Sequence, residues 1–200
     1  MKSMTEMVGD GNGNSHVDQV TKDRQWRIAG LLFVGSDVVF VAALLLSYLY
    51  LRVLNVNHLW RPSYVHPAST ASTWLIAAVV VVSAGFYRYG ARGIAAGSSA
   101  KLTRGILAAV LLLLVEIALQ IHQMTAVQFG PQSGGYASSY FALAGYHIFH
   151  LGLAVLLGLA VLNRSVHGKF TQAHHMEITV LGYFWYWVAS VAVIVALLPK

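Results

Sequence analysis

The chain has 200 residues, of which 57% are hydrophobic and only 10% are charged. This composition is typical of a membrane protein; it leaves room for several spans of roughly 20 apolar residues and excludes a large soluble domain. The absence of cysteine excludes disulfides, thiolate metal sites and thiol nucleophiles, and the net charge of +6 is not gathered in the basic stripe that nucleic-acid binding requires, so we expect no nucleic-acid partner.

The first segment of the chain is polar. Its opening residues are rich in glycine, asparagine and serine, and they contain no apolar stretch followed by a cleavage site. We therefore expect residues 1–25 to form a flexible, uncleaved tail, and residues 26–200 to form one transmembrane domain.

Five apolar runs follow this tail, each long enough for a transmembrane helix. Pro62 and Pro67 would break any helix in the connection between the first two runs, and Gly130 and Pro131 would do so in the connection between the third and the fourth. We expect helices at about 26–50, 70–88, 105–127, 136–162 and 176–198. The predicted fold class is an all-α membrane protein with five transmembrane helices.

The lysines and arginines predict the orientation of these helices. Ten of the thirteen lie in the segment up to Arg27 and in the second and fourth connections, which share one side of the membrane. Positive residues near span ends are retained on the cytoplasmic side. We therefore expect the amino terminus in the cytoplasm and the carboxyl terminus outside.

Six ionisable side chains fall at or near membrane depth, where each is costly unless it has a partner or water. They are Asp37, Glu116, His122, His147, His150 and Glu177. Asp37 lies about ten residues into the first span, too deep for its short side chain to reach the interface, so it needs a specific partner. A proton or lipid role and a buried hydrogen-bonded carboxyl both remain open for Asp37, and Glu116 is similar. Glu177 is favoured as a solvated acid at a helix start, stabilised by the helix dipole.

His147 and His150 are three residues apart and so share one helix face, together with Gly145 and Gly152. The glycines predict that another helix approaches this face closely. Metal or haem ligation is one interpretation of the histidines, but a membrane b-type cytochrome needs histidines on two helices at matching depth. His122 is the other intramembrane candidate, and it falls near the outer end of its span. A hydrogen-bonded packing pair is therefore favoured.

Three motifs, in this order, resemble subunit III of the haem-copper oxidases. "GSDVVFVAALLLSYLYLR" is similar to the Ser-Glu-x-x-Phe-Phe helix of that family, and "YASSYFALAGYHIFHLGLAVLLG" to its Gly-x-His-x-x-His helix. "FTQAHH" followed by "WYW" is similar to the start of its last helix. The resemblance covers residues 26–198, and five spans match the short form of the subunit, which lacks two amino-terminal helices.

The resemblance implies an accessory subunit that has no catalytic centre, binds neither haem nor copper, and packs with subunits I and II of a proton-translocating terminal oxidase in the inner (plasma) membrane. Family members fold as two helix groups separated by a V-shaped cleft that holds phospholipids. They support proton uptake into the catalytic subunit and its durability. By position, Asp37 replaces the family's glutamate, and His147 and His150 match its two histidines.

The last helix departs from the family pattern. Val188 stands where a histidine is usual, no aspartate follows it, and Glu177 lies farther from the tryptophans than the family's glutamate. This departure leaves open a subunit III-like protein associated with nitric oxide reductase. Two other classes remain as alternatives: a haem-binding membrane cytochrome, and a small transporter or channel that uses Asp37 and Glu116 as a proton pathway.

Overall fold

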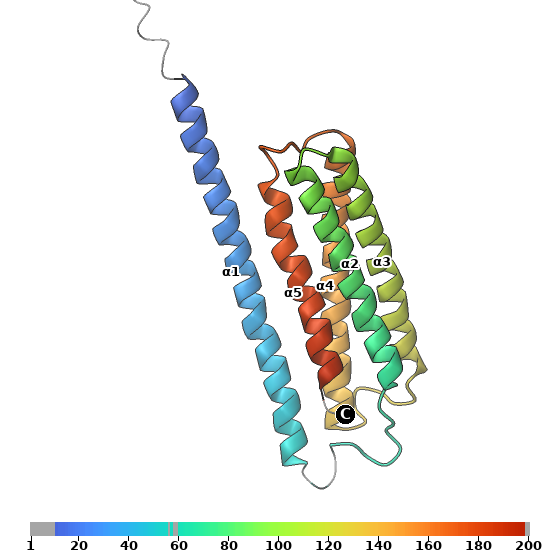
Figure 1. Ribbon diagram of the computed structural model, residues 1–200. Coiled ribbons are helices and arrows are strands. Elements are labelled where there is room, and N and C mark those ends of the chain that lie inside the picture. The colour runs from blue at the N-terminus through green and yellow to red at the C-terminus, as the bar shows by residue number, and fades with distance from the viewer. Residues whose placement is uncertain (1–10, 56, 58–59, 199–200) are drawn as a thin grey trace, which may run out of the picture.

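Five long helices make up the computed structural model of the chain, which describes residues 11–55, 57 and 60–198 (Figure 1). They are α1 (Gly11–Leu54), α2 (Thr70–Ala95), α3 (Ser99–Ala126), α4 (Gly135–Val166) and α5 (Met176–Leu197). Each helix contains a stretch that is long and apolar enough to cross a membrane. The predicted all-α class with five such helices is confirmed.

The helix α1 begins earlier than predicted. The sequence places residues 1–25 in a flexible tail, whereas the structure continues the helix back to Gly11. Once the apolar part has formed a helix, adding residues requires no new nucleation, and an i,i+4 hydrogen bond from Gln19 Nε2 to Asp23 Oδ1, 3.2 Å long, supports the added turns. The predicted start of this helix at about residue 26 is therefore corrected to Gly11, and residues 1–10 lie outside the described residues.

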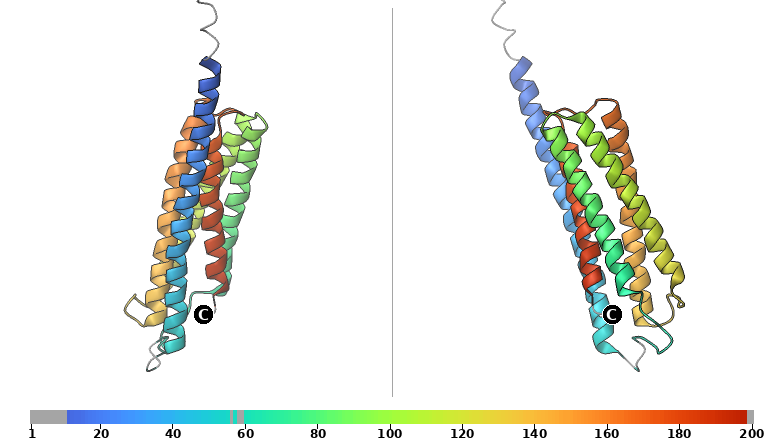
Figure 2. Two further views of the ribbon diagram at one scale, coloured as in Figure 1. Left: turned by 90° about the vertical axis from the view of Figure 1, so that its left-hand side faces the viewer. Right: turned by 45° about the vertical axis from the view of Figure 1, so that its right-hand side comes forward.

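Four of the helices form a ring. In the described part of the chain, α2 contacts α3, α3 contacts α4, α4 contacts α5, and α5 contacts α2. The helix α1 lies outside this ring against α4 and α5, and it tilts away from them toward its amino-terminal end (Figures 1 and 2). Its exposed side is lined by large apolar side chains such as Leu32, Val39 and Val53, as expected for a surface that faces lipid.

Trp185 of α5 lies at the centre of the ring and is only 1% exposed. Its ring stacks on Tyr87 of α2 with 4.6 Å between centroids, and its Nε1 donates to Ser83 Oγ at 3.1 Å. The Ser83 hydroxyl in turn donates to the carbonyl oxygen of Ala109 on α3 at 2.9 Å. Three helices are thus connected by a hydrogen-bonded chain in which the buried donors have partners, as an interior without water requires.

The helices α2 and α3 approach each other closely at Gly90 and Gly105. A Cβ atom added to Gly105 would lie 2.6 Å from Gly90 Cα and 2.8 Å from the carbonyl oxygen of Phe86, inside contact distance of backbone that cannot rotate away. Small residues at such a crossing let two transmembrane backbones pack directly. This contact fixes α3, and with it the depth of Glu116.

Candidate functional site

Two histidines of α4 each meet a carboxyl group from a different helix. His147 Nε2 lies 2.9 Å from Glu116 Oε1 on α3, and His150 Nε2 lies 3.0 Å from Asp37 Oδ1 on α1. Glu116 is fully buried, both histidines are 6% exposed, and the Asp37 side chain is 10% exposed. The structure therefore brings together four of the six residues singled out in the sequence, as two pairs that connect α4 to its neighbours on two sides.

The two imidazoles diverge, although both belong to the buried side of α4. A spacing of three residues separates two side chains by about 60° around a helix axis. This angle is enough to direct His147 toward α3 and His150 toward α1. The close helix approach predicted at Gly145 and Gly152 is not made within the described chain, because a Cβ atom at either glycine would meet nothing within 4 Å.

Every polar atom around Asp37 has a partner in the protein. Asp37 Oδ2 accepts hydrogen bonds from the Tyr146 hydroxyl and from Trp187 Nε1, both at 2.6 Å. His150 Nδ1 lies 2.8 Å from the carbonyl oxygen of Tyr146, which only accepts, so this nitrogen carries a proton. One further proton then lies between His150 Nε2 and Asp37 Oδ1. Whichever atom holds it, the pair as a whole is neutral, and it joins α1, α4 and α5.

The second pair is incompletely partnered. Glu116 Oε2 and His147 Nδ1 are both buried, and neither has a hydrogen-bond partner among the described residues. A buried polar atom without a partner costs about 1–3 kcal/mol. The two pairs therefore differ: the Asp37 pair is saturated, whereas the Glu116 pair has hydrogen-bonding capacity left over.

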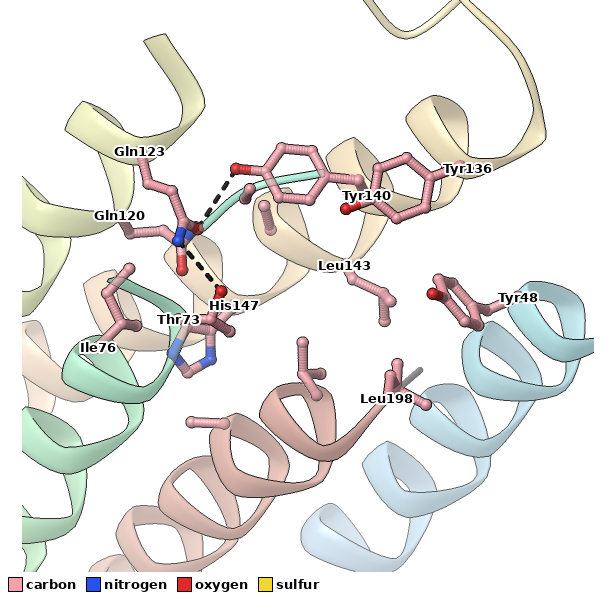
Figure 3. A pocket seen from close by; sticks show the side chains of 14 residues that line it. Tyr48, Thr73, Ile76, Gln120, Gln123, Tyr136, Tyr140, Leu143, His147 and Leu198 are labelled. Carbon is pink, nitrogen blue, oxygen red and sulfur yellow. Dashed lines mark hydrogen bonds between the residues drawn. The ribbon is translucent and has the colours of Figure 1, made fainter. Parts of the chain in front are cut away.

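A cavity of about 70 Å³ lies beside His147, at the end of the ring where α3 ends and α4 begins. The residues with polar groups that line it are Tyr48, Thr73, Gln120, Gln123, Tyr136, Tyr140 and His147. Figure 3 shows the two glutamines, Thr73 and His147 on one side of this cavity, with Tyr48, Tyr136 and Leu198 on the other.

Gln123 organises this polar side. Its Nε2 donates to Ser72 Oγ at 2.7 Å and to Thr73 Oγ1 at 3.3 Å, while its Oε1 accepts from Gln120 Nε2 at 3.3 Å and from the Tyr140 hydroxyl at 3.4 Å. Side chains of α2, α3 and α4 are thus connected one to two turns of α3 beyond Glu116, toward the carboxyl end of that helix.

The remaining two predicted residues lie apart from both pairs. His122 is exposed near the carboxyl end of α3, where it lines an open pocket of about 600 Å³ together with His66. Glu177 lies in the first turn of α5 and forms an ion pair with Arg164 of α4; the two side chains are 33% and 47% exposed. An exposed pair of this kind contributes at most about 1 kcal/mol. Glu177 is thus a partly exposed acid at a helix start, paired with a cation.

The donor set does not fit a metal or haem. Among the described residues, no group of three or more histidine, aspartate or glutamate side chains could hold a metal ion. His147 and His150 lie on one helix, both ring nitrogens of His150 are engaged in hydrogen bonds, and His122 is exposed. The two pairs instead join α4 to α3 and to α1.

Tyr146 and Trp187 complete the Asp37 cluster, and the sequence did not indicate this role. Both fall in aromatic segments, which are usual for packing and for membrane interfaces. A chemical argument could have found them. A carboxyl group at membrane depth needs several hydrogen-bond donors, and tyrosine and tryptophan each combine one donor with a large apolar ring.

The sequence of the chain matches a known protein family. Residues 4–198 match the family described as cytochrome c oxidase subunit III. A cytochrome c oxidase subunit 3 from Petromyzon marinus is 25% identical over 166 residues, which cover 81% of this chain and 64% of that protein. The subunit 3 of Rattus norvegicus is 21% identical over 187 residues (92% and 71%), and that of Triticum aestivum is 23% identical over 166 residues (81% and 63%). The chain thus spans 63–71% of the length of these curated relatives.

Proposed function

The chain belongs to the cytochrome c oxidase subunit III family, and from this premise we propose that it is a non-catalytic subunit of a haem-copper terminal oxidase. Haem and copper then reside in partner subunits I and II, which reduce dioxygen and translocate protons in aerobic respiration. The observation that carries this proposal is the family match over residues 4–198, because it spans all five helices.

The role proposed for this chain is to stabilise the catalytic subunit and to support its proton uptake. The motif positions Asp37, His147 and His150 are used inside the chain, where they join α1, α3 and α4. A subunit whose helices are fixed in this way presents a defined surface to its partner.

Phospholipid binding is a further part of the proposal. A pocket of about 380 Å³ lies between α1, α4 and α5 near the end where α1 tilts away (Figure 1). Apolar side chains such as Phe33, Leu157 and Leu181 line most of it, and the paired side chains of Arg164 and Glu177 line it as well. The apolar part suits an acyl chain, and a lipid phosphate would compete with Glu177 for the Arg164 guanidinium. We propose this pocket as the lipid-holding cleft, with α1 as one helix group and the ring as the other.

We place the chain in the inner (plasma) membrane with its amino terminus in the cytoplasm. The start of α1, the α2–α3 connection and the α4–α5 connection share one end of the bundle (Figure 1). Nine of the eleven lysines and arginines among the described residues lie in these segments or in the helix ends next to them, so the positive-inside rule supports this orientation.

Of the alternatives, the accessory protein of nitric oxide reductase is not favoured, because the curated relatives reported above are named as cytochrome c oxidase subunit 3. The donor geometry speaks against a haem-binding cytochrome. A proton channel built from Asp37 and Glu116 would need the two acids to share one path, whereas they pair with different histidines of α4, one directed toward α1 and the other toward α3.

The proposal is tested by oxygen consumption during prolonged turnover of the oxidase complex. With Asp37→Ala in this chain, we expect an initial rate near that of the wild type and a shorter working life, because three helices lose their common acceptor. A matched control is Ser47→Ala, since Ser47 is exposed on the same helix and its hydroxyl donates only to the Ala43 carbonyl one turn away. An Asp37→Ala complex that lasts as long as this control would contradict the proposal.

A further inference from the structure

We propose that the Glu116–His147 pair is a proton-binding site in contact with water, reached through the cavity beside His147 from the end of the bundle where α3 meets α4. The Asp37–His150 pair, by contrast, is a closed structural contact. This inference concerns the chain itself and does not depend on which partner it assembles with.

The first observation is the orphaned ring nitrogen. His147 is 6% exposed, it lines the cavity, and its Nδ1 has no partner among the described residues. If this nitrogen carries a proton it needs an acceptor, and if it does not it needs a donor. Water serves either case, whereas an apolar side chain serves neither.

The second observation is the space. A buried water needs roughly 10–15 Å³ of cavity volume and two to four polar partners. The cavity offers about 70 Å³ and is lined by Thr73, Gln120, Gln123 and Tyr140 as well as His147. Several waters therefore fit, each within reach of hydroxyl or amide groups.

The third observation is a continuation toward the surface. The open pocket of about 600 Å³ near the connection before α2 shares Ala68, Ile76 and Gln123 with the inner cavity. Gln123 therefore stands between the two spaces, with Ser72 and Thr73 as its hydrogen-bond partners. A chain of waters along these groups would connect His147 to the solvent.

The charges support a bound proton. Lysine, arginine, aspartate and glutamate are absent from the residues that line the inner cavity; its other ionisable groups are Tyr48 of α1 and Tyr136 and Tyr140 of α4, while Tyr64, His66 and His122 line the outer pocket. With no lysine or arginine paired to it in the described chain, Glu116 has His147 as its partner. The pair is neutral when it holds two protons, one on His147 Nδ1 and one shared between His147 Nε2 and Glu116 Oε1. Water that reaches His147 can exchange these protons.

The test is hydrogen–deuterium exchange followed by infrared spectroscopy on the full chain in lipid nanodiscs. Bands of the two carboxyl groups are assigned by their loss in Glu116→Gln and in Asp37→Asn. We expect the Glu116 band to shift soon after D₂O is introduced and the Asp37 band to shift much later. In Gln123→Leu the Glu116 shift should slow by an order of magnitude, while the Asp37 shift keeps its rate.

An Asp37 band that exchanges as fast as the Glu116 band, or a Gln123→Leu chain with unchanged exchange, overturns the proposal. Where Glu116→Gln does not fold, a high-resolution map of the wild-type chain decides the question. Ordered water within hydrogen-bond distance of His147 Nδ1 supports the proposal, and a dry cavity overturns it.

Discussion

Removing the Asp37 carboxylate of α1 removes the hydrogen-bond acceptor shared by side chains of α4 and α5. Asp37→Ala leaves the Tyr146 hydroxyl, Trp187 Nε1 and the facing nitrogen of His150 without their acceptor. Three groups left without partners would cost about 3–9 kcal/mol at the values found for fully buried groups in soluble proteins, whereas hydrogen bonds between membrane helices average about 0.6 kcal/mol each. Since α1 lies at the edge of the bundle, where these groups can turn toward lipid or water, we expect a loss of about 2–4 kcal/mol in the free energy of unfolding.

A double-mutant cycle separates this effect from general damage. Unfolding of the full chain by SDS in mixed micelles, followed by tryptophan fluorescence, gives the stability of Asp37→Ala, His150→Leu and the double variant. The double variant should be more stable than the sum of the single losses predicts, by about 1 kcal/mol, because one change already removes the contact. Ser47→Ala should cost less than about 0.5 kcal/mol. Additive losses, or an Asp37→Ala loss no larger than that of Ser47→Ala, would refute the proposed network.

Three other substitutions probe the ring by the same unfolding assay. Gly105→Leu should cost about 3 kcal/mol or more, because its Cβ would collide with the backbone of Gly90, and a wild-type stability would disprove that crossing. Tyr87→Phe should cost about 1 kcal/mol, since the hydroxyl donates to the Ile178 carbonyl at 2.6 Å; an unchanged free energy of unfolding would count against that bond. Arg164→Met should cost less than about 1 kcal/mol because its ion pair is exposed, and a larger loss would show that the pair matters more than its exposure suggests.

The positions of the helices could be predicted from the sequence because the thickness of the membrane sets the length of the apolar stretch in each helix. The predicted starts at about 70, 136 and 176 compare with Thr70, Gly135 and Met176 in the structure. The helix α3 begins at Ser99 rather than at about 105, because hydropathy marks only the part inside the membrane and Lys101 and Arg104 continue the helix beyond it. Polar extensions of this kind explain the early start of α1 as well.

The pairing of the buried groups is a question of depth and of rotation around the helix. Glu116 lies ten residues before the end of α3, and His147 lies twelve residues after the start of α4. At about 1.5 Å per residue these depths differ by only about 3 Å, so in adjacent antiparallel helices the pair was accessible from sequence. The direction of His150 toward α1 was not, because it depends on which helices border α4. That arrangement follows from contacts between helices far apart in the chain, such as α1 with α4 and α5.

The most direct test of the central claim is to purify the full chain through a tag in mild detergent, and to identify by mass spectrometry and absorption spectroscopy what accompanies it. If the buried acids and imidazoles serve only to join helices and hold protons, a haem-containing partner should co-purify, and the chain separated from it should be colourless. Stoichiometric iron or copper on the separated chain, or a chain that purifies with no haem-containing partner, would contradict the assignment.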